Sequence, residues 1–386
     1  MAEHPHAPRL TPRGVEHRAR FGDRSLFSGL ESLVYFNHAA ISPPSLASKH
    51  AMVAWVEDMG KRGAAGFSGW MAQRARLREK LAKLVGATAE EIGFEPNTSR
   101  GVSDVALCFP FQRGDAIVLF EGEFPANIVP WLQAAERHAL KVRWLKASDF
   151  LGDLDAALTK LEAALEGARL CAVSAVQFQT GLRMPLTAIG ERCKARGVRL
   201  FVDAVQAVGM VPIDVVASSI DYLACGSHKW LMGVEGAGFL FVAKARFGEL
   251  RPNVAGWLSL EDSIGFLFEG PGRLRYDHQV VRTPSFVEGG NLAAGAFAAL
   301  EASVDFLLDL RVPEIFAHVQ KIHDVLEPEL LRLGFTSVRA EDPARRSGSL
   351  SVLPPSDVSV VELQPMLARY GIASSIALGQ CGENRR

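Results

Sequence analysis

Residues 226–230 read Gly-Ser-His-Lys-Trp, and this is the most informative stretch of the chain. An apolar run at 220–225 precedes it and predicts a buried strand, so Lys229 lies in a loop at the exit of that strand. There the amine can be desolvated, which lowers its pKa and makes it a nucleophile towards a carbonyl. Asp203 ends another apolar run at 198–202. Ligands of open parallel sheets bind beyond the carboxyl ends of the strands, so both residues are expected to face one crevice.

An amine and a carboxylate at that edge suit one cofactor in particular. Pyridoxal 5′-phosphate (PLP) is a carbonyl compound that a protein lysine holds as a Schiff base, and its pyridinium nitrogen needs an acidic partner. We expect Lys229 to form the Schiff base and then to shuttle a proton, while Asp203 keeps the ring nitrogen protonated. Each residue alone is a weak indication, because most lysines are solvated and Asp203 also suits a helix N-cap.

Further residues at the same edge complete a cofactor site. Gln206 follows the acid by three residues and is placed to donate to the ring hydroxyl. Phe124 follows another apolar run and can stack on the ring face. Thr98 and Ser99 precede a predicted helix and offer hydroxyls and free N–H groups to the phosphate. Loop packing explains Phe124 equally well, and helix capping explains Thr98 and Ser99, but the whole set is improbable by chance.

The middle of the chain alternates between apolar strands and helices. Strands are predicted at 116–120, 170–176, 198–202, 220–225 and 238–242, with helices such as 154–165 and 186–196 between most of them. Such alternation is typical of an α/β fold with a mostly parallel sheet covered on both faces. The last two runs are too close for a helical crossover, so we expect antiparallel neighbours, as at a sheet edge.

Three parts are expected along the chain. Residues 1–40 form an arm that packs on a small domain, 41–290 form a large domain, and 291–386 form the smaller α+β C-terminal domain. The second boundary is placed where the sequence pattern changes, because an irregular polar stretch at 273–288 is followed by a predicted helix at 292–310.

Composition and motif spacing exclude several classes of protein. The net charge is −1, with 42 basic and 43 acidic residues, so the chain lacks the excess of positive charge that is typical of proteins that bind nucleic acids. No apolar run is long enough to span a bilayer. The 5 cysteines include no CxxC pair, which argues against a metal site and favours a reducing cytoplasm. The glycines at 233, 236 and 238 lack the spacing of a dinucleotide-binding loop, which disfavours a nicotinamide dehydrogenase.

With these motifs the chain resembles the class V aminotransferase family of PLP enzymes, over roughly residues 35–376. The segment 202–207, VDAVQA, is similar to the family's ring-nitrogen segment, and 226–230 to its Schiff-base loop. The segment 121–127, EGEFPAN, resembles the one with the ring-stacking residue, and 177–181, QFQTG, resembles the epimerase-like branch. The resemblance implies a type I PLP-dependent transferase fold with a seven-stranded sheet, a small amino acid as substrate, and His228 as a phosphate ligand.

The same resemblance implies a homodimer. The segment 288–291, EGGN, is similar to one that reaches the phosphate of the neighbouring subunit, which would give Asn291 that role. The family usually has Thr at this place, so the chain departs from the pattern in the residue that makes the contact.

Two further departures leave the reaction open. Ile376 falls where some relatives carry an arginine that clamps the substrate carboxylate. Cys381 lies close to where a cysteine desulfurase holds its nucleophile, so a desulfurase or selenocysteine lyase is one alternative, beside a chance cysteine at a chain end. A non-catalytic protein that retains the fold is another. His38 either lines the substrate pocket or serves as a capping or core histidine.

Overall fold

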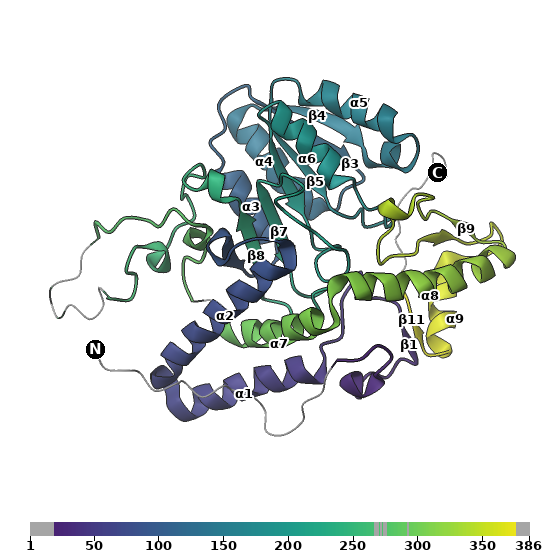
Figure 1. Cartoon of the computed structure of the whole chain (residues 1–386), viewed down its shortest axis with the longest axis horizontal. Helices are drawn as coiled ribbons and strands as arrows, with labels where there is room; N and C mark the ends of the chain where they lie inside the picture. The colour runs from purple at the N-terminus through teal and green to yellow at the C-terminus, as the bar shows by residue number, and fades with distance from the viewer. Residues whose placement is uncertain (1–18, 266–269, 271, 273–275, 292, 376–386) are drawn as a thin grey trace.

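A seven-stranded sheet lies at the centre of the computed structural model, which describes residues 19–265, 270, 272, 276–291 and 293–375 (Figure 1). The strand order is β2-β8-β7-β6-β5-β3-β4. The strands are β2 (Ile92–Glu95), β3 (Ala116–Glu121), β4 (Lys141–Lys146), β5 (Ala168–Ser174), β6 (Arg199–Asp203), β7 (Tyr222–Gly226) and β8 (Gly238–Val242). The strand β8 runs antiparallel to both of its neighbours, β7 and β2, and the other pairings in this sheet are parallel. The predicted α/β fold with a mostly parallel sheet is therefore confirmed.

The strand β8 departs from the prediction in one respect. It is antiparallel to β7, as the short connection predicts, with Tyr222 opposite Val242. The expectation that this pair forms the sheet edge is wrong, because β2 pairs with β8 on its other side and places Ile92 opposite Phe241. The sequence does not reveal β2, because its four residues include one glycine and one glutamate.

Helices cover both faces of the sheet (Figure 1). The core that contains Phe120 and Val202 includes residues of α5, α6 and α7, whereas the core that contains Leu119 and Phe201 includes residues of α3 and α4. Neighbouring strand residues thus alternate between two apolar layers, as a sheet buried on both sides requires. The helices are α1 (Leu46–Arg62), α2 (Phe67–Val85), α3 (Thr98–Cys108), α4 (Val129–His138), α5 (Leu154–Leu165), α6 (Leu186–Ala195), α7 (Ala294–Leu310), α8 (Val312–Arg332) and α9 (Val360–Arg369). Within the described ranges, none has the length and apolarity to cross a membrane.

The N-terminal segment meets the C-terminal part of the chain. The strand β1 (Val34–Tyr35) pairs in parallel with β11 (Ile372–Ala373). A second small sheet is formed by β9 (Thr336–Ser337) and β10 (Val352–Leu353). The division into arm, large domain and small domain stays a prediction. An arm that packs on the small domain requires a contact such as the β1–β11 pairing.

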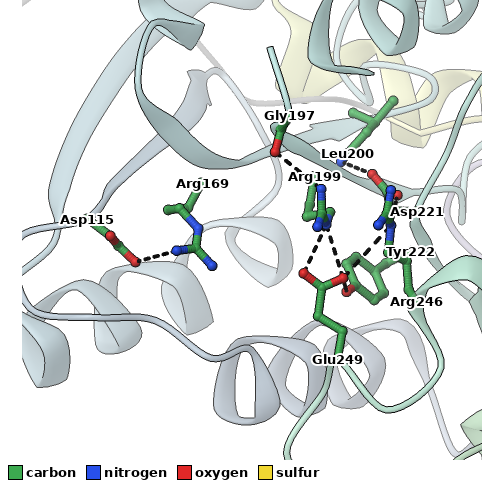
Figure 2. Close-up of polar contacts among 9 residues, drawn as sticks. All are labelled: Asp115, Arg169, Gly197, Arg199, Leu200, Asp221, Tyr222, Arg246 and Glu249. Carbon is green, nitrogen blue, oxygen red and sulfur yellow. Dashed lines mark hydrogen bonds and ion pairs between the residues drawn. The ribbon is translucent and has the colours of Figure 1, made fainter. Parts of the chain in front are cut away.

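A network of ion pairs and hydrogen bonds joins the amino ends of β6 and β7 (Figure 2). Arg199 Nε lies 2.9 Å from Glu249 Oε1, and Tyr222 donates its hydroxyl to the other oxygen of this carboxylate at 3.1 Å. Asp221 accepts from Leu200 N at 2.8 Å and pairs with an arginine at position 246. The charges at this end are matched with one another, so the network holds the strand ends together.

Candidate active site

Several loops meet at the carboxyl edge of the sheet. The strand β6 ends at Asp203, and β7 ends one loop before Lys229. Phe124 follows the end of β3, and Thr98 begins α3 shortly after β2. Lys229 Nζ lies 5.6 Å from the centre of the Phe124 ring. The structure therefore brings together the predicted nucleophile, the predicted acid and the predicted stacking residue.

Lys229 is half-buried and Asp203 is buried, and the two lie close enough to shift each other's pKa. Burial lowers the pKa of the Lys229 amine, and the nearby Asp203 and Cys225 oppose that shift. Burial raises the pKa of the Asp203 carboxyl to about 6, against the opposing effects of the Val205 N–H and of Lys229. The Val205 N–H donates to Asp203 Oδ1 at 3.0 Å. At neutral pH the carboxylate is thus ionised and keeps a cation or a positively charged ring nitrogen close by.

The backbone around Lys229 is fixed by close contacts. Ser227 N donates to Ala237 O at 3.0 Å, which closes the loop between β7 and β8. Gly209 packs directly against this loop, because a Cβ there would lie 2.4 Å from Trp230 O, and its φ is +94°. Only glycine adopts that conformation at low cost and leaves room for the carbonyl. The backbone position from which the Lys229 side chain extends is therefore fixed.

The predicted phosphate ligands lie around the start of α3. Thr98 Oγ1 accepts from Gly226 N at 2.9 Å, which joins the first turn of α3 to the end of β7. A Cβ on Gly226 would lie 3.0 Å from Thr98 Oγ1 and 3.3 Å from His228 Nδ1, so both side chains flank that glycine. Thr98 and Ser99 are part of the helix itself, and Asn97 is its N-cap. The first N–H groups of a helix lack partners inside it, so those of Thr98 and Ser99 are available to an anion.

Sequence comparison decides the family. The profile of the class V aminotransferases matches residues 59–381. The chain belongs to the class V aminotransferase family. A probable cysteine desulfurase of Methanothermobacter thermautotrophicus is 29% identical over 77% of this chain and 72% of its own length. An isopenicillin N epimerase of Streptomyces clavuligerus is 28% identical over 78% of this chain and 76% of its own length. A solved structure of a C-DES variant, with glycine covalently linked to the PLP cofactor, aligns over 91% of each chain with a TM-score of 0.82 and 23% identity.

This member of the class V family is a PLP-dependent enzyme, and its described residues fit that cofactor. Lys229 offers a desolvated amine for an aldehyde, and Asp203 offers a buried carboxylate for a ring nitrogen. Phe124 is 48% exposed, which leaves its ring free to receive a flat partner. The donor groups at the start of α3 suit a phosphate. The set therefore matches the aldehyde, ring and phosphate of one molecule.

Gln206 has protein partners at both ends of its amide. Nε2 donates to Ala39 O at 2.9 Å, and Oε1 accepts from Trp230 Nε1 at 3.0 Å. The side chain thus ties the N-terminal loop to the residue after Lys229. One amide hydrogen is left for another acceptor, so the predicted contact with the ring hydroxyl stays a prediction. The sequence does not reveal the Ala39 contact, because it joins residues far apart along the chain.

His38 belongs to an aromatic stack beside the lysine loop. Its ring lies 5.6 Å from that of Trp230 at an angle of 13°, and Tyr35 meets it edge-on at 5.2 Å. Burial lowers the pKa of His38 to about 4, so the imidazole is neutral at physiological pH. Ser42 N donates to His228 O at 2.8 Å, which places the loop with His38 against the lysine loop.

Three predicted residues of the class V pattern lie at the margin of the described chain. Asn291 is exposed, and its predicted contact with a neighbouring subunit stays a prediction. The preceding Glu288 is anchored by Arg78 at 2.7 Å and by the Phe94 N–H at 3.0 Å. Ile376 and Cys381 lie outside the described residues.

Glu123 is a feature of the site that the sequence analysis misses. Its Oε1 accepts from Ser174 N at 2.7 Å, and Oε2 contacts the Ser174 hydroxyl. Burial raises the pKa of Glu123 to about 7, and the nearby Asp203 adds to that shift. A glutamate just after a strand is typical of a solvated loop, so only its position next to Phe124 could have indicated a role.

Proposed function

We propose that this enzyme acts on bonds at the Cα atom of a small amino acid, with transamination or a related elimination or epimerisation as the reaction. Lys229 is the covalent and proton-transferring residue, and Asp203 is the partner of the ring nitrogen. The observation that carries the proposal is the desolvated Lys229 amine, which lies near both Asp203 and the Phe124 ring.

The two catalytic residues divide the proton chemistry. When bound, PLP supplies an electron sink for the pair left at Cα when a bond to that atom breaks. Burial of Lys229 increases the neutral fraction of its amine, which is the form that attacks an aldehyde. The same amine then accepts a proton at Cα or returns one. Asp203, ionised above its pKa of about 6, holds a proton on the ring nitrogen.

The remaining residues bind and orient the cofactor. Phe124 stacks on the ring, and Thr98, Ser99 and His228 hold the phosphate. Gln206 keeps the N-terminal loop beside the substrate and retains one N–H for the ring hydroxyl. Because Thr98 already accepts from Gly226 N, its hydroxyl proton remains free to point at an anion.

The test is a visible absorption spectrum of purified protein loaded with PLP, followed by titration with a panel of amino acids. We expect a band from the lysine-bound cofactor that at least one small amino acid perturbs. Lys229→Ala should lack the band, whereas Lys194→Ala, at an exposed position, should keep it. A wild-type band that no amino acid alters would support a non-catalytic protein and contradict this proposal.

Removal of sulfur from cysteine, or of selenium from selenocysteine, is a second candidate. Relatives named cysteine desulfurase and the presence of Cys381 favour it. A thiolate near the site would attack the substrate sulfur and carry it as a persulfide. Release of alanine from cysteine should then fall sharply in Cys381→Ser, and undiminished release would remove the thiol from the mechanism.

We further propose that the enzyme is a homodimer. On α1, Met52, Val53, Val56 and Met59 are all exposed, and their spacing puts them near one another along one side of the helix. We propose that this face is buried against a second copy, and the family pattern implies that Asn291 then serves the neighbouring site. Dilution that yields monomer should then release PLP, and a monomer that retains PLP would count against this arrangement.

We assign the protein to the cytoplasm. The four cysteines in the described part of the chain are free and buried, which suits a reducing compartment. Cell fractionation tests the assignment, and recovery of the protein outside the cytoplasm would contradict it.

A further inference from the structure

Glu123 connects the loop that carries Phe124 to the sheet beneath the cofactor residues. Its carboxyl group accepts from Ser174 N at 2.7 Å and also contacts the hydroxyl of that serine. Ser174 is the last residue of β5 and pairs in register with Asp203 on β6. Glu123 therefore lies one strand away from the proposed partner of the ring nitrogen, and directly before the proposed stacking residue.

We propose that Glu123 is a positioning residue of the cofactor site, which fixes the Phe124 loop through Ser174 and sets the charge next to Asp203. This inference rests on the proposed function, because it concerns the same lysine-bound cofactor. Two hydrogen-bonding contacts from one carboxyl group to one residue leave the loop little freedom to slide along the strand. A shift of that loop would move the Phe124 ring, which lies 5.6 Å from Lys229 Nζ.

The charge of Glu123 depends on the groups around it. Asp203 faces it from β6, Ser174 and Cys171 from β5, and Asn127 from the following turn. Burial raises the pKa of Glu123 to about 7 and Asp203 raises it further, while the contacts with Ser174 lower it. Between the pKa of Asp203, about 6, and that of Glu123, about 7, Asp203 is the only ionised carboxylate of the two. Above the pKa of Glu123, a second negative charge appears close to the first.

That second charge has a defined effect on the cofactor. A nearby anion favours the protonated form of a nitrogen base, so ionised Glu123 raises the pH at which the lysine-bound cofactor loses its proton. Replacing Glu123 by Gln removes the charge and keeps a group of the same shape. The amide oxygen can still accept from Ser174 N, and the amide nitrogen can donate to the serine hydroxyl.

The experiment is a pH titration of the visible absorption band in protein loaded with PLP. We expect the midpoint in Glu123→Gln to lie lower than in wild type by roughly one pH unit, with little change in PLP affinity. Glu121→Gln is the matched control, because Glu121 is exposed and lies on the same segment. Its midpoint should equal that of wild type. A purely structural role would change PLP affinity without moving the midpoint.

Ser174→Ala provides a second variant that keeps the carboxyl group. It removes a hydroxyl that favours the charged form of Glu123, so Glu123 should ionise at higher pH and the midpoint should shift towards that of Glu123→Gln. A band that persists in both variants with the wild-type midpoint would overturn the inference and leave the proposed function intact. If Glu123→Gln does not fold, the midpoint of Ser174→Ala decides alone. Failure of the proposed function looks different, because the wild type would then show no lysine-dependent band.

Discussion

Replacing Asp203 by Asn should stabilise the cofactor-free protein at alkaline pH. Burial raises the pKa of this carboxyl from 3.8 to about 6, so the folded state binds its proton more tightly than the unfolded chain does. One pKa unit corresponds to about 1.4 kcal/mol, so ionised Asp203 lowers the free energy of unfolding by about 3 kcal/mol. Asn carries no charge, and its side-chain oxygen can still accept from Val205 N.

The stability gained in Asp203→Asn should increase as the pH rises. Well below the unfolded pKa of 3.8, Asp203 is protonated in both states and the penalty vanishes. The penalty grows as the pH rises towards the folded pKa of about 6, and it is complete above that value. The folded pKa of about 6 already includes the attraction between Asp203 and the Lys229 amine, so the loss of that attraction in the variant needs no separate correction. We therefore expect a net gain of about 2–3 kcal/mol near pH 8, and little difference near pH 3.5.

Denaturant unfolding of the apo-protein at several pH values measures this difference. Asp153→Asn is the matched control, because Asp153 is an exposed N-cap whose side chain also accepts backbone N–H groups. Its effect should be small and nearly independent of pH. An Asp203→Asn protein that is less stable than wild type near pH 8, or whose stability differs from wild type equally at every pH, would show that ionised Asp203 does not destabilise the folded protein. A gain would mean that the buried carboxylate is kept at the expense of stability, as expected for a group with a chemical task.

Other substitutions test separate parts of the site. Gln206→Ala should reduce the free energy of unfolding of the apo-protein by about 1–3 kcal/mol, because Trp230 Nε1 and Ala39 O lose their partner. Gln112→Ala, at an exposed position, should leave the free energy of unfolding unchanged. Equal unfolding curves for Gln206→Ala and wild type would show that Gln206 serves only the cofactor. Gly209→Ala should destabilise by at least about 2 kcal/mol, because its Cβ would lie 2.4 Å from Trp230 O at a positive φ. By contrast, Gly60→Ala within α1, where a Cβ meets nothing within 4 Å, should be neutral or stabilising, and a comparison of melting temperatures decides. Phe124→Ala should weaken PLP binding roughly 3- to 10-fold with little change in apo-protein stability, since the side chain is 48% exposed. An unaltered PLP affinity would show that Phe124 does not stack on the cofactor.

The interior strands could be predicted from sequence because burial on both faces leaves a continuous apolar run. The runs at 198–202 and 220–225 correspond to β6 and β7 within one or two residues. The two strands that were missed, β2 and β4, are the edges of the sheet. β4 reads Lys-Val-Arg-Trp-Leu-Lys and is only partly buried, so its pattern is that of a polar edge strand and carries no continuous apolar signal.

The candidate site shows the same limit at the level of side chains. Lys229 and Asp203 could be found because each follows a recognisable strand and carries a chemical group with few alternative uses. The partners of Gln206 could not, because the loop at Ala39 approaches only through the tertiary fold. Glu123 was missed for a related reason, since its burial arises from contact with the end of β5. Local pattern thus locates groups on strands and loops, and long-range packing decides which of them are buried together.

Reductive trapping tests most directly whether Lys229 carries the cofactor. Protein loaded with PLP would be reduced with borohydride and digested, and the pyridoxyl group would be located by peptide mass spectrometry. We expect the label on Lys229 alone, and no label in a Lys229→Arg variant. Label on a different lysine of the wild type, or undiminished labelling of the variant, would contradict it.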